Sequence, residues 1–478
     1  MKWAKARRWL LLFVILGLVR GIMYAAIIPP WQGPDEPQHF EYVRLLRDRH
    51  RWVPYGDVSV PLEQEIIGSM LRHQFRPFGL GDFEAADPPE TFKEIWGKQG
   101  VDTRLGTPPL YHLIAGLPLH LPITSNVTAQ LYLSRGMSIL MGVLLIAVVF
   151  LIGWEAFPQS PPVFLGATIF VLFLPMFMYV TAVVNSDNLA NLIVALVTYL
   201  LIVIIMRGFR FRWGAILLLL ISAGIATKKT TLITIPLAAL AIPLAWWARD
   251  SRHRKISPRF TWAAVGVVAL GVLLFVPGST RGLLLGTSRR IAAVANRYDS
   301  SGMFTRTFKV LLSKRLWGPE AWSLYRTYPA AIFKSFWGAF GWRTIPLSDG
   351  LYLALGVVCA LSALGLALFV VRVVRNRSDL SVAQRSSLWL LFGLIVLSLG
   401  AATIFSATLS RQPQGRYLFT ALPGIAILFV IGIREIVPAR FRRGVSFAGL
   451  VGLIVFDFAA LFAYVLPAYY VRGFPWWW

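Results

Sequence analysis

Long apolar runs constrain the fold of this chain more than any other feature. Nine runs are close to or above the ~20 residues that an α-helix needs to cross a lipid bilayer. They cover residues 9–28, 134–155, 161–184, 188–206, 261–277, 351–374, 386–408, 417–433 and 445–467. Hydrophobic residues make up 56% of the chain, and the mean hydropathy is +0.63. This pattern predicts an all-α, polytopic membrane protein.

Two shorter apolar runs leave the number of crossings open. Residues 213–227 and 231–247 flank Lys228-Lys229-Thr230, and each run is shorter than the ~20 residues that a spanning helix requires. The two runs form either two short spans or one re-entrant hairpin, which gives about eleven or about nine crossings. Both alternatives leave the same topology, because the pair adds an even number of crossings.

The basic residues predict the orientation. The first apolar run lacks a clear small-residue cleavage site and ends in Pro29-Pro30, so we expect an uncleaved helix rather than a signal peptide. With the N-terminus in the cytoplasm, the cytoplasmic stretches hold 20 of the 47 Lys and Arg, as the positive-inside rule requires. These stretches are residues 1–8, 207–212, 248–259, 372–385 and 434–443. The net charge of +25 therefore reflects topology, and we expect no nucleic-acid partner. Arg20 interrupts the first run, where it either snorkels or contacts neighbouring helices.

The polar residues gather in two outer loops. The first loop, residues 29–133, holds 13 of the 22 acids and five of the six histidines, so we expect a folded polar layer with interfacial helices. The second loop, residues 278–349, holds 11 Lys and Arg against three acids. This cationic loop could hold anionic lipid head groups or a phosphate-bearing substrate. Alternatively, it is charge that a long translocated segment tolerates.

Several kinds of site are excluded. The chain has no Walker-type phosphate loop, no dinucleotide-binding glycine fingerprint and no sizeable cytoplasmic stretch, so a nucleotide-dependent reaction inside the cell is not expected. The single cysteine, Cys359, excludes intramolecular disulfides and cysteine-based metal sites. An activated substrate would have to reach the outer face in the lipid.

A pair of acids follows the first apolar run. Residues 29–40 read PPWQGPDEPQHF, so Asp35, Glu36 and His39 stand where a membrane helix leaves the bilayer. We expect Asp35 to be a general base and Glu36 its catalytic neighbour. The three side chains could also bind a divalent cation (Mg, Mn or Ca), since His39 shares a helical face with the acids. The alternative is that the acids only begin an interfacial helix.

Other polar residues belong to the same outer face in this topology. Asp187 stands near the start of an apolar run and is either a second acid of the site or a helix cap. Basic side chains on this face are candidates for binding a donor phosphate. A charge near an apolar stretch is energetically unfavourable unless it is paired, and arginine can bind a phosphate through two hydrogen bonds. These candidates are Lys228, Lys229, Arg416, Arg411 and Arg135.

Taken together, the motifs resemble those of the GT-C superfamily of membrane glycosyltransferases, of the protein O-mannosyltransferase and aminoarabinose-transferase type. The resemblance is carried by residues 34–40, 107–111, 185–191, 228–230, 335–342 and 414–418. It makes Tyr111 a further candidate site residue. The chain looks closest to a bacterial family of predicted multi-pass membrane proteins. The resemblance implies a polyprenyl-phosphate-sugar donor, inversion at the anomeric carbon and an outer-face carboxylate that activates the acceptor.

We therefore expect a single GT-C-like domain over residues 1–478 that transfers a hexosyl or pentosyl group to an extracytoplasmic glycan or lipid. The expected location is the bacterial inner membrane, among membrane lipids, with the N-terminus cytoplasmic and the active site and C-terminus outside. The alternative is a transporter or flippase of lipid-linked saccharides, which would need polar residues at mid-membrane on several helices.

Overall fold

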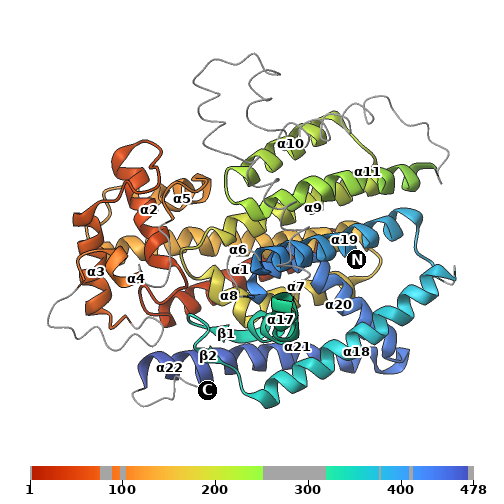
Figure 1. Cartoon of the computed structure of the whole chain (residues 1–478). Helices are drawn as coiled ribbons and strands as arrows, with labels where there is room; N and C mark the ends of the chain where they lie inside the picture. Colours follow the sequence, from red (N-terminus) through yellow and green to blue (C-terminus); the bar gives the residue numbers. More distant parts are fainter. Residues whose placement is uncertain are drawn as a thin grey trace.

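The computed structural model describes residues 3–75, 89–96, 104–250, 319–375, 378–407 and 413–471. The predicted span 261–277, the basic loop from residue 278 to residue 318, and Arg411 lie outside these ranges. The described part is almost entirely helical (Figure 1). Its one sheet joins β1 (Ala339–Phe340) and β2 (Ile345–Pro346) as an antiparallel pair.

Eight helical segments of the described chain are long and apolar enough to cross a membrane. Four of them are α1 (Trp3–Ile27), α6 (Val127–Ala156), α9 (Asp187–Arg207) and α18 (Asp349–Val374). The others are η3 with α11 (Lys229–Ile233, Thr234–Asp250), α19 (Val382–Phe405), η5 with α20 (Gly415–Ala421, Leu422–Ile436), and the last one, η6, α21, η7 and α22 (Ala439–Phe441, Arg442–Ala459, Ala460–Val465, Leu466–Tyr470). The prediction of an all-α, polytopic membrane protein is confirmed.

The apolar run at residues 161–184 is a broken span. Its helices α7 (Pro161–Leu172) and α8 (Pro175–Thr181) meet at an angle of 59°. Pro175 has no N–H to continue the ladder of α7 and begins α8 instead, as proline favours the first turn of a helix. A second interruption, residues 182–186 between α8 and α9, leaves backbone groups that meet polar partners near the site described below.

The short helix α10 (Phe211–Ile225) returns the chain along α9. The Nζ atom of Lys228, which follows α10, lies 2.6 Å from Oδ1 of Asp187 at the start of α9. The tip between α10 and α11 therefore reaches the end of the bundle at which α9 begins. Figure 1 shows α10, α9 and α11 lying side by side. This arrangement favours two passes, a short one in α10 and a longer one in η3 with α11, over a re-entrant hairpin.

The stretch between α1 and α6 is folded into helices at one end of the molecule (Figure 1). It contains α2 (Glu36–Arg49), α3 (Val60–Arg72), α4 (Phe92–Trp96), α5 (Leu110–Ala115) and η2 (Leu117–His120). Buried aromatic residues pack this layer, since Trp31 contacts Phe40 edge to face and Trp96 contacts Phe92 in the same way. The layer holds α2 over the ends of the membrane helices.

One further helix, α17 (Pro319–Gly338), packs against α8 and η5. It approaches η5 so closely that a Cβ atom at Gly415 would lie 2.2 Å from the backbone N of Phe336. The backbone N–H of Gly415 also donates to Oγ of Ser335 at 2.7 Å. Glycine at this position therefore sets where the next residue, Arg416, can reach.

Candidate active site

Five charged side chains from distant parts of the sequence meet at one end of the bundle. Asp35 precedes α2, Asp187 begins α9, Lys228 precedes η3, and Arg416 lies in η5. The fifth, Arg104, lies in the loop before α5. An Nη2 atom from each arginine contacts the same Oδ2 atom of Asp35, at 2.8 Å from Arg104 and at 3.3 Å from Arg416.

The local backbone directs the Asp35 side chain toward these arginines. Asp35 adopts a left-handed conformation (φ 62°), which aspartate tolerates better than most residues. It occupies the N-cap position of α2, but its side chain makes no capping hydrogen bond. The carboxylate therefore does not cap the helix, which argues against the alternative that Asp35 only begins an interfacial helix.

The surrounding charges keep Asp35 ionised. Burial raises the pKa of its carboxyl, but Arg104, Arg416 and Lys228 together outweigh burial and hold the pKa below its usual value. Asp187 faces the same cluster and is paired with Lys228. The site therefore carries three cations and two carboxylates in a largely buried setting.

The arginines keep hydrogen-bond donors unused. Arg416 is only 8% exposed, yet its Nε and Nη1 atoms have no hydrogen-bond partner among the described residues. The Nε atom of Arg104 is in the same condition. Because a buried donor without a partner costs about 1–3 kcal/mol, this arrangement favours an incoming anion with several acceptor oxygens, such as a phosphate.

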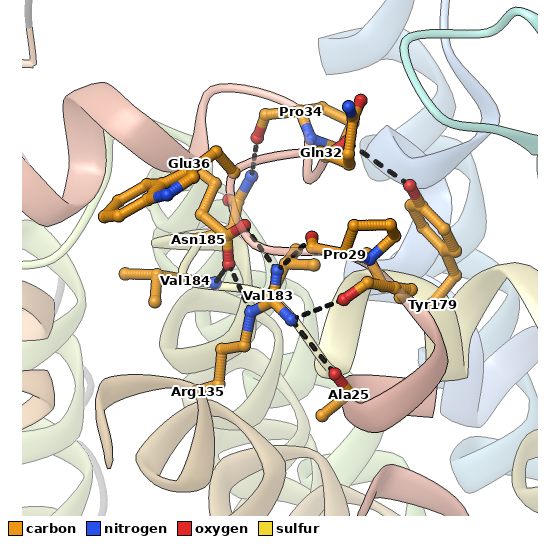
Figure 2. A network of polar contacts seen from close by, with 12 residues as sticks. Ala25, Pro29, Gln32, Pro34, Glu36, Arg135, Tyr179, Val183, Val184 and Asn185 are labelled. Atoms are coloured by element: carbon orange, nitrogen blue, oxygen red, sulfur yellow. Dashed lines mark hydrogen bonds and ion pairs between the residues drawn. The ribbon is translucent and has the colours of Figure 1, made fainter. Parts of the chain in front are cut away.

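Glu36 and Arg135 form a separate network, shown in Figure 2. Arg135 donates to both carboxylate oxygens of Glu36, from Nε to Oε1 at 2.8 Å and from Nη2 to Oε2 at 2.7 Å, and both residues are fully buried. The backbone N–H of Val184 donates to Oε1 at 3.0 Å. The other donors of Arg135 reach the carbonyls of Ala25, Ile28 and Pro29.

This network bears on two expectations. The Glu36 carboxylate is occupied by Arg135 and the Val184 N–H, and the donors of Arg135 are occupied by Glu36 and three backbone carbonyls. The catalytic or metal-binding role of Glu36 and the phosphate-binding role of Arg135 stay predictions that this pairing does not favour. The reason is geometric: successive residues at the start of a helix point about 100° apart, so adjacent acids need not share a site. Instead, the network joins the end of α1, α6 and the connection between α8 and α9 into a base under Asp35.

Asparagines complete this base. The side chain of Asn188 donates to the carbonyls of Val180 and Val183 at 3.1 Å each. The Asn185 side chain accepts from the backbone N–H of Asp187 at 2.9 Å, and it approaches the Pro34 carbonyl at 3.4 Å. These bonds use carbonyl groups that the end of α8 and the connection to α9 leave unpaired, and they position Asp187 near Asp35.

A pair of histidines lies beside the charged cluster. Nδ1 of His39 is 2.9 Å from Nε2 of His112, and both rings are buried. Burial lowers the pKa of both imidazoles, that of His112 to about 3, with Arg104 adding to the effect, so both are neutral. The Tyr111 hydroxyl is 2.7 Å from Oγ of Ser138, and this contact attaches α5 to α6.

The expected metal ligands are turned toward different partners. Glu36 faces Arg135 and His39 faces His112, and within the described ranges no three His, Cys, Asp or Glu side chains are grouped so that they could hold a metal ion. A divalent cation at this site stays a prediction. Lys229 is exposed at the start of η3.

Arg104 was not anticipated from the sequence. It is one of many basic residues in the first outer loop, and its only distinguishing signal is its place three residues before Thr107 of the motif at residues 107–111. His112 likewise follows that motif directly. Proximity to a motif is a weak signal, and only the folded loop brings Arg104 to Asp35.

The fold and the site define a polytopic, all-α membrane protein with a buried cluster of charges at one end of its helices. Residues 18–425 match the model of the family described as "Predicted membrane protein (DUF2142)". The chain belongs to this family, which confirms the expected membership of a family of predicted membrane proteins.

Comparison with solved structures finds the Archaeoglobus fulgidus oligosaccharyltransferase, tethered with an acceptor peptide that contains the NVT sequon. The sequence identity is 12% and the TM-score is 0.49. The similarity covers 96% of this chain and 55% of that chain, so this chain spans about half the length of that protein. None of the curated proteins matches the chain.

Proposed function

We propose that this protein is a membrane glycosyltransferase that moves a sugar from a polyprenyl-phosphate donor to an extracytoplasmic glycan or lipid acceptor. The observation that carries the proposal is the ionised Asp35 carboxylate beside two arginines with unused donors, at the end of a membrane-spanning bundle. The motif at residues 34–40, which resembles that of GT-C enzymes, agrees with this reading.

The proposed reaction needs one base and several cations. An acceptor hydroxyl attacks the anomeric carbon, a new C–O bond forms, and the bond between that carbon and the phosphate oxygen breaks. The hydroxyl proton passes to the Asp35 carboxylate. The leaving group departs as a phosphate anion and needs no proton, so cations that hold its charge lower the barrier.

The cations are assigned by their position. Arg416, with two unused donor atoms, would grip the phosphate, and Arg104 would approach from the more exposed side. Lys228 would add charge while it stays paired with Asp187. Inversion at the anomeric carbon, and transfer of a hexosyl or pentosyl group, rest on the family resemblance.

The proposed location is the bacterial inner membrane with the site on the outer face. The ends of α9, α18 and α20 remote from the site carry Arg207, Arg372 and Arg434 in their last turns. By the positive-inside rule, this opposite end is the cytoplasmic one. The acceptor and the head group of the donor would then meet Asp35 outside.

Release of sugar from a panel of polyprenyl-phosphate sugars by the reconstituted protein tests the proposal. Transfer or slow hydrolysis by the wild type, abolished in Asp35→Asn, is the expected result. Asparagine suits the left-handed backbone at residue 35, so the variant should fold. A parallel series with EDTA and added Mg, Mn or Ca tests the metal prediction. Donor lipid that crosses the bilayer without loss of sugar would instead support a transporter.

A further inference from the structure

Asp35 occupies the position in which an anionic ligand would be expected. Its Oδ2 atom accepts from two guanidinium groups, which is how one phosphate oxygen is commonly held by arginines. Asp187 and Lys228 neutralise each other nearby, and His39 and His112 are neutral. In the described site, the negative charge facing Arg104 and Arg416 is therefore supplied by the protein itself.

We propose that the Asp35 carboxylate is a placeholder for the donor phosphate, and that phosphate binding transfers Arg104 from Asp35 to the phosphate. This inference rests on the proposed function, because it concerns the same site and a phosphate-bearing donor. It assigns to Arg104 a direct contact with the substrate and makes release of Asp35 a consequence of donor binding.

The two arginines differ in their freedom to move. The Arg416 side chain is 8% exposed and follows Gly415, which is wedged against α17. The Arg104 side chain is 34% exposed. The loop backbone beneath it is held by the bond from Gly106 N–H to the Val53 carbonyl at 3.0 Å. Arg104 can thus change partner by rotating its side chain while its backbone stays in place.

The exchange of Arg104 from Asp35 to the phosphate reduces the repulsion between the donor phosphate and the Asp35 carboxylate. A phosphate beside an ionised carboxylate is repelled unless cations separate the two charges. If Arg104 leaves Asp35 for the phosphate, the carboxylate loses one of the cations that depress its pKa and becomes a stronger base. Asp35 would then gain proton affinity at the moment when a donor is bound, and would stay a weak base without one.

A double-mutant cycle on phosphate affinity tests the exchange. The dissociation constant of farnesyl phosphate is measured for the purified wild type, Arg104→Gln, Asp35→Asn and the double variant, with farnesol as the uncharged reference. Asp35→Asn should bind about tenfold tighter than the wild type, because it removes the competing carboxylate. Arg104→Gln should weaken binding about twofold in the wild type but about tenfold in Asp35→Asn, where the guanidinium is free for phosphate.

Each other outcome has a distinct meaning. Equal weakening by Arg104→Gln in both backgrounds, or no weakening in either, would overturn the exchange while phosphate binding and the proposed function stand. If no variant binds farnesyl phosphate more tightly than farnesol, both the proposal of a phosphate-bearing donor and the proposed exchange are wrong.

Asp35→Gly, which also fits the left-handed backbone, replaces Asp35→Asn in the cycle if that variant does not fold. The ion pair of Arg49 and Asp57, in the same outer layer, supplies the control substitutions Arg49→Gln and Asp57→Asn, which should leave the affinity unchanged.

Discussion

At the scale of single residues, Asp35 and Glu36 are neighbours in sequence but perform different tasks. Asp35 faces Arg104 and Arg416 in the charged cluster, whereas Glu36 is sealed into the network with Arg135. The sequence pattern predicted that both acids matter, and it predicted Asp35, Asp187, Lys228 and Arg416 as members of one face. It could not separate the roles of Asp35 and Glu36, because side-chain direction at a helix start depends on the fold.

The different roles predict different failures. Asp35→Asn should abolish sugar transfer and lower the melting temperature less than Glu36→Gln does, because the Asp35 side chain is 15% exposed whereas Glu36 is fully buried. Glu36→Gln should lower the melting temperature, because it leaves the buried Arg135 charge without its partner, at a cost of about 3–5 kcal/mol. Thermal unfolding of both purified variants in the same detergent measures this difference. A Glu36→Gln protein with wild-type stability and no activity would show instead that Glu36 takes part in catalysis.

The charges around Asp35 predict a pH dependence. Asp35 accepts a proton only when ionised, so activity is lost as the pH falls through its pKa. Since that pKa lies below its usual value, kcat/KM for the free enzyme should persist into more acidic solution than an ordinary carboxylate allows. Arg104→Gln removes a cation and should move the acidic limb up by about one pH unit. A limb that stays in place in Arg104→Gln would contradict the pairing, and Arg49→Gln is the control.

At the scale of elements, close contact between η5 and α17 decides where Arg416 lies. A Cβ atom on Gly415 would meet backbone atoms of Phe336 and the Ile332 carbonyl, neither of which can move without shifting α17. The apolar pattern predicted the span that η5 and α20 form, but not this contact. A helical pattern reports which residues are apolar and is silent on which neighbour comes within van der Waals distance.

Gly415→Ala should therefore weaken farnesyl phosphate binding severalfold and lower the melting temperature, since overpacking costs about 1–3 kcal/mol. Gly400 in α19 is the matched control, because a Cβ atom there would meet nothing within 4 Å. Gly400→Ala should keep the affinity and gain up to about 1 kcal/mol of helix propensity. Equal behaviour of the two alanine variants would show that η5 does not depend on the close approach.

At the scale of the whole molecule, a buried polar cluster joins the first membrane-spanning segment to the last one that the structure describes. Arg20 of α1 forms an ion pair with Asp457 of α21 and donates from Nε to the Leu172 carbonyl at 3.1 Å. The Tyr24 hydroxyl donates to Oδ1 of Asp457 at 2.9 Å. Of the two alternatives for Arg20, the contact with neighbouring helices is the one observed. These contacts pair the Arg20 and Asp457 charges inside the bundle, although Nη2 of Arg20 has no hydrogen-bond partner among the described residues. Paired charges suit a contact that joins helices better than a transport path.

Asp457→Asn should lower the melting temperature by leaving Arg20 unpaired, at a cost of about 3–5 kcal/mol. The double variant Arg20→Met with Asp457→Leu should recover most of the loss, because removing both charges leaves no unpaired group. Thermal unfolding of Arg20→Met, Asp457→Leu and the double variant completes the comparison. Additive losses would show that the two residues act independently.

The sequence by itself determined the class of protein, most of the membrane spans and the end of the bundle that bears polar residues. These features follow from hydropathy and charge along the chain, which can be assigned to each segment without knowing which other segments it contacts in the fold. Tertiary structure alone decided which charges meet: Arg416 reaches Asp35 across 381 positions, Arg104 joins them from a position outside the motifs, and Arg135 pairs with Glu36. Such pairings depend on how helices pack, because the cost of burying a charge in a membrane is relieved only by the partner that the fold brings to it.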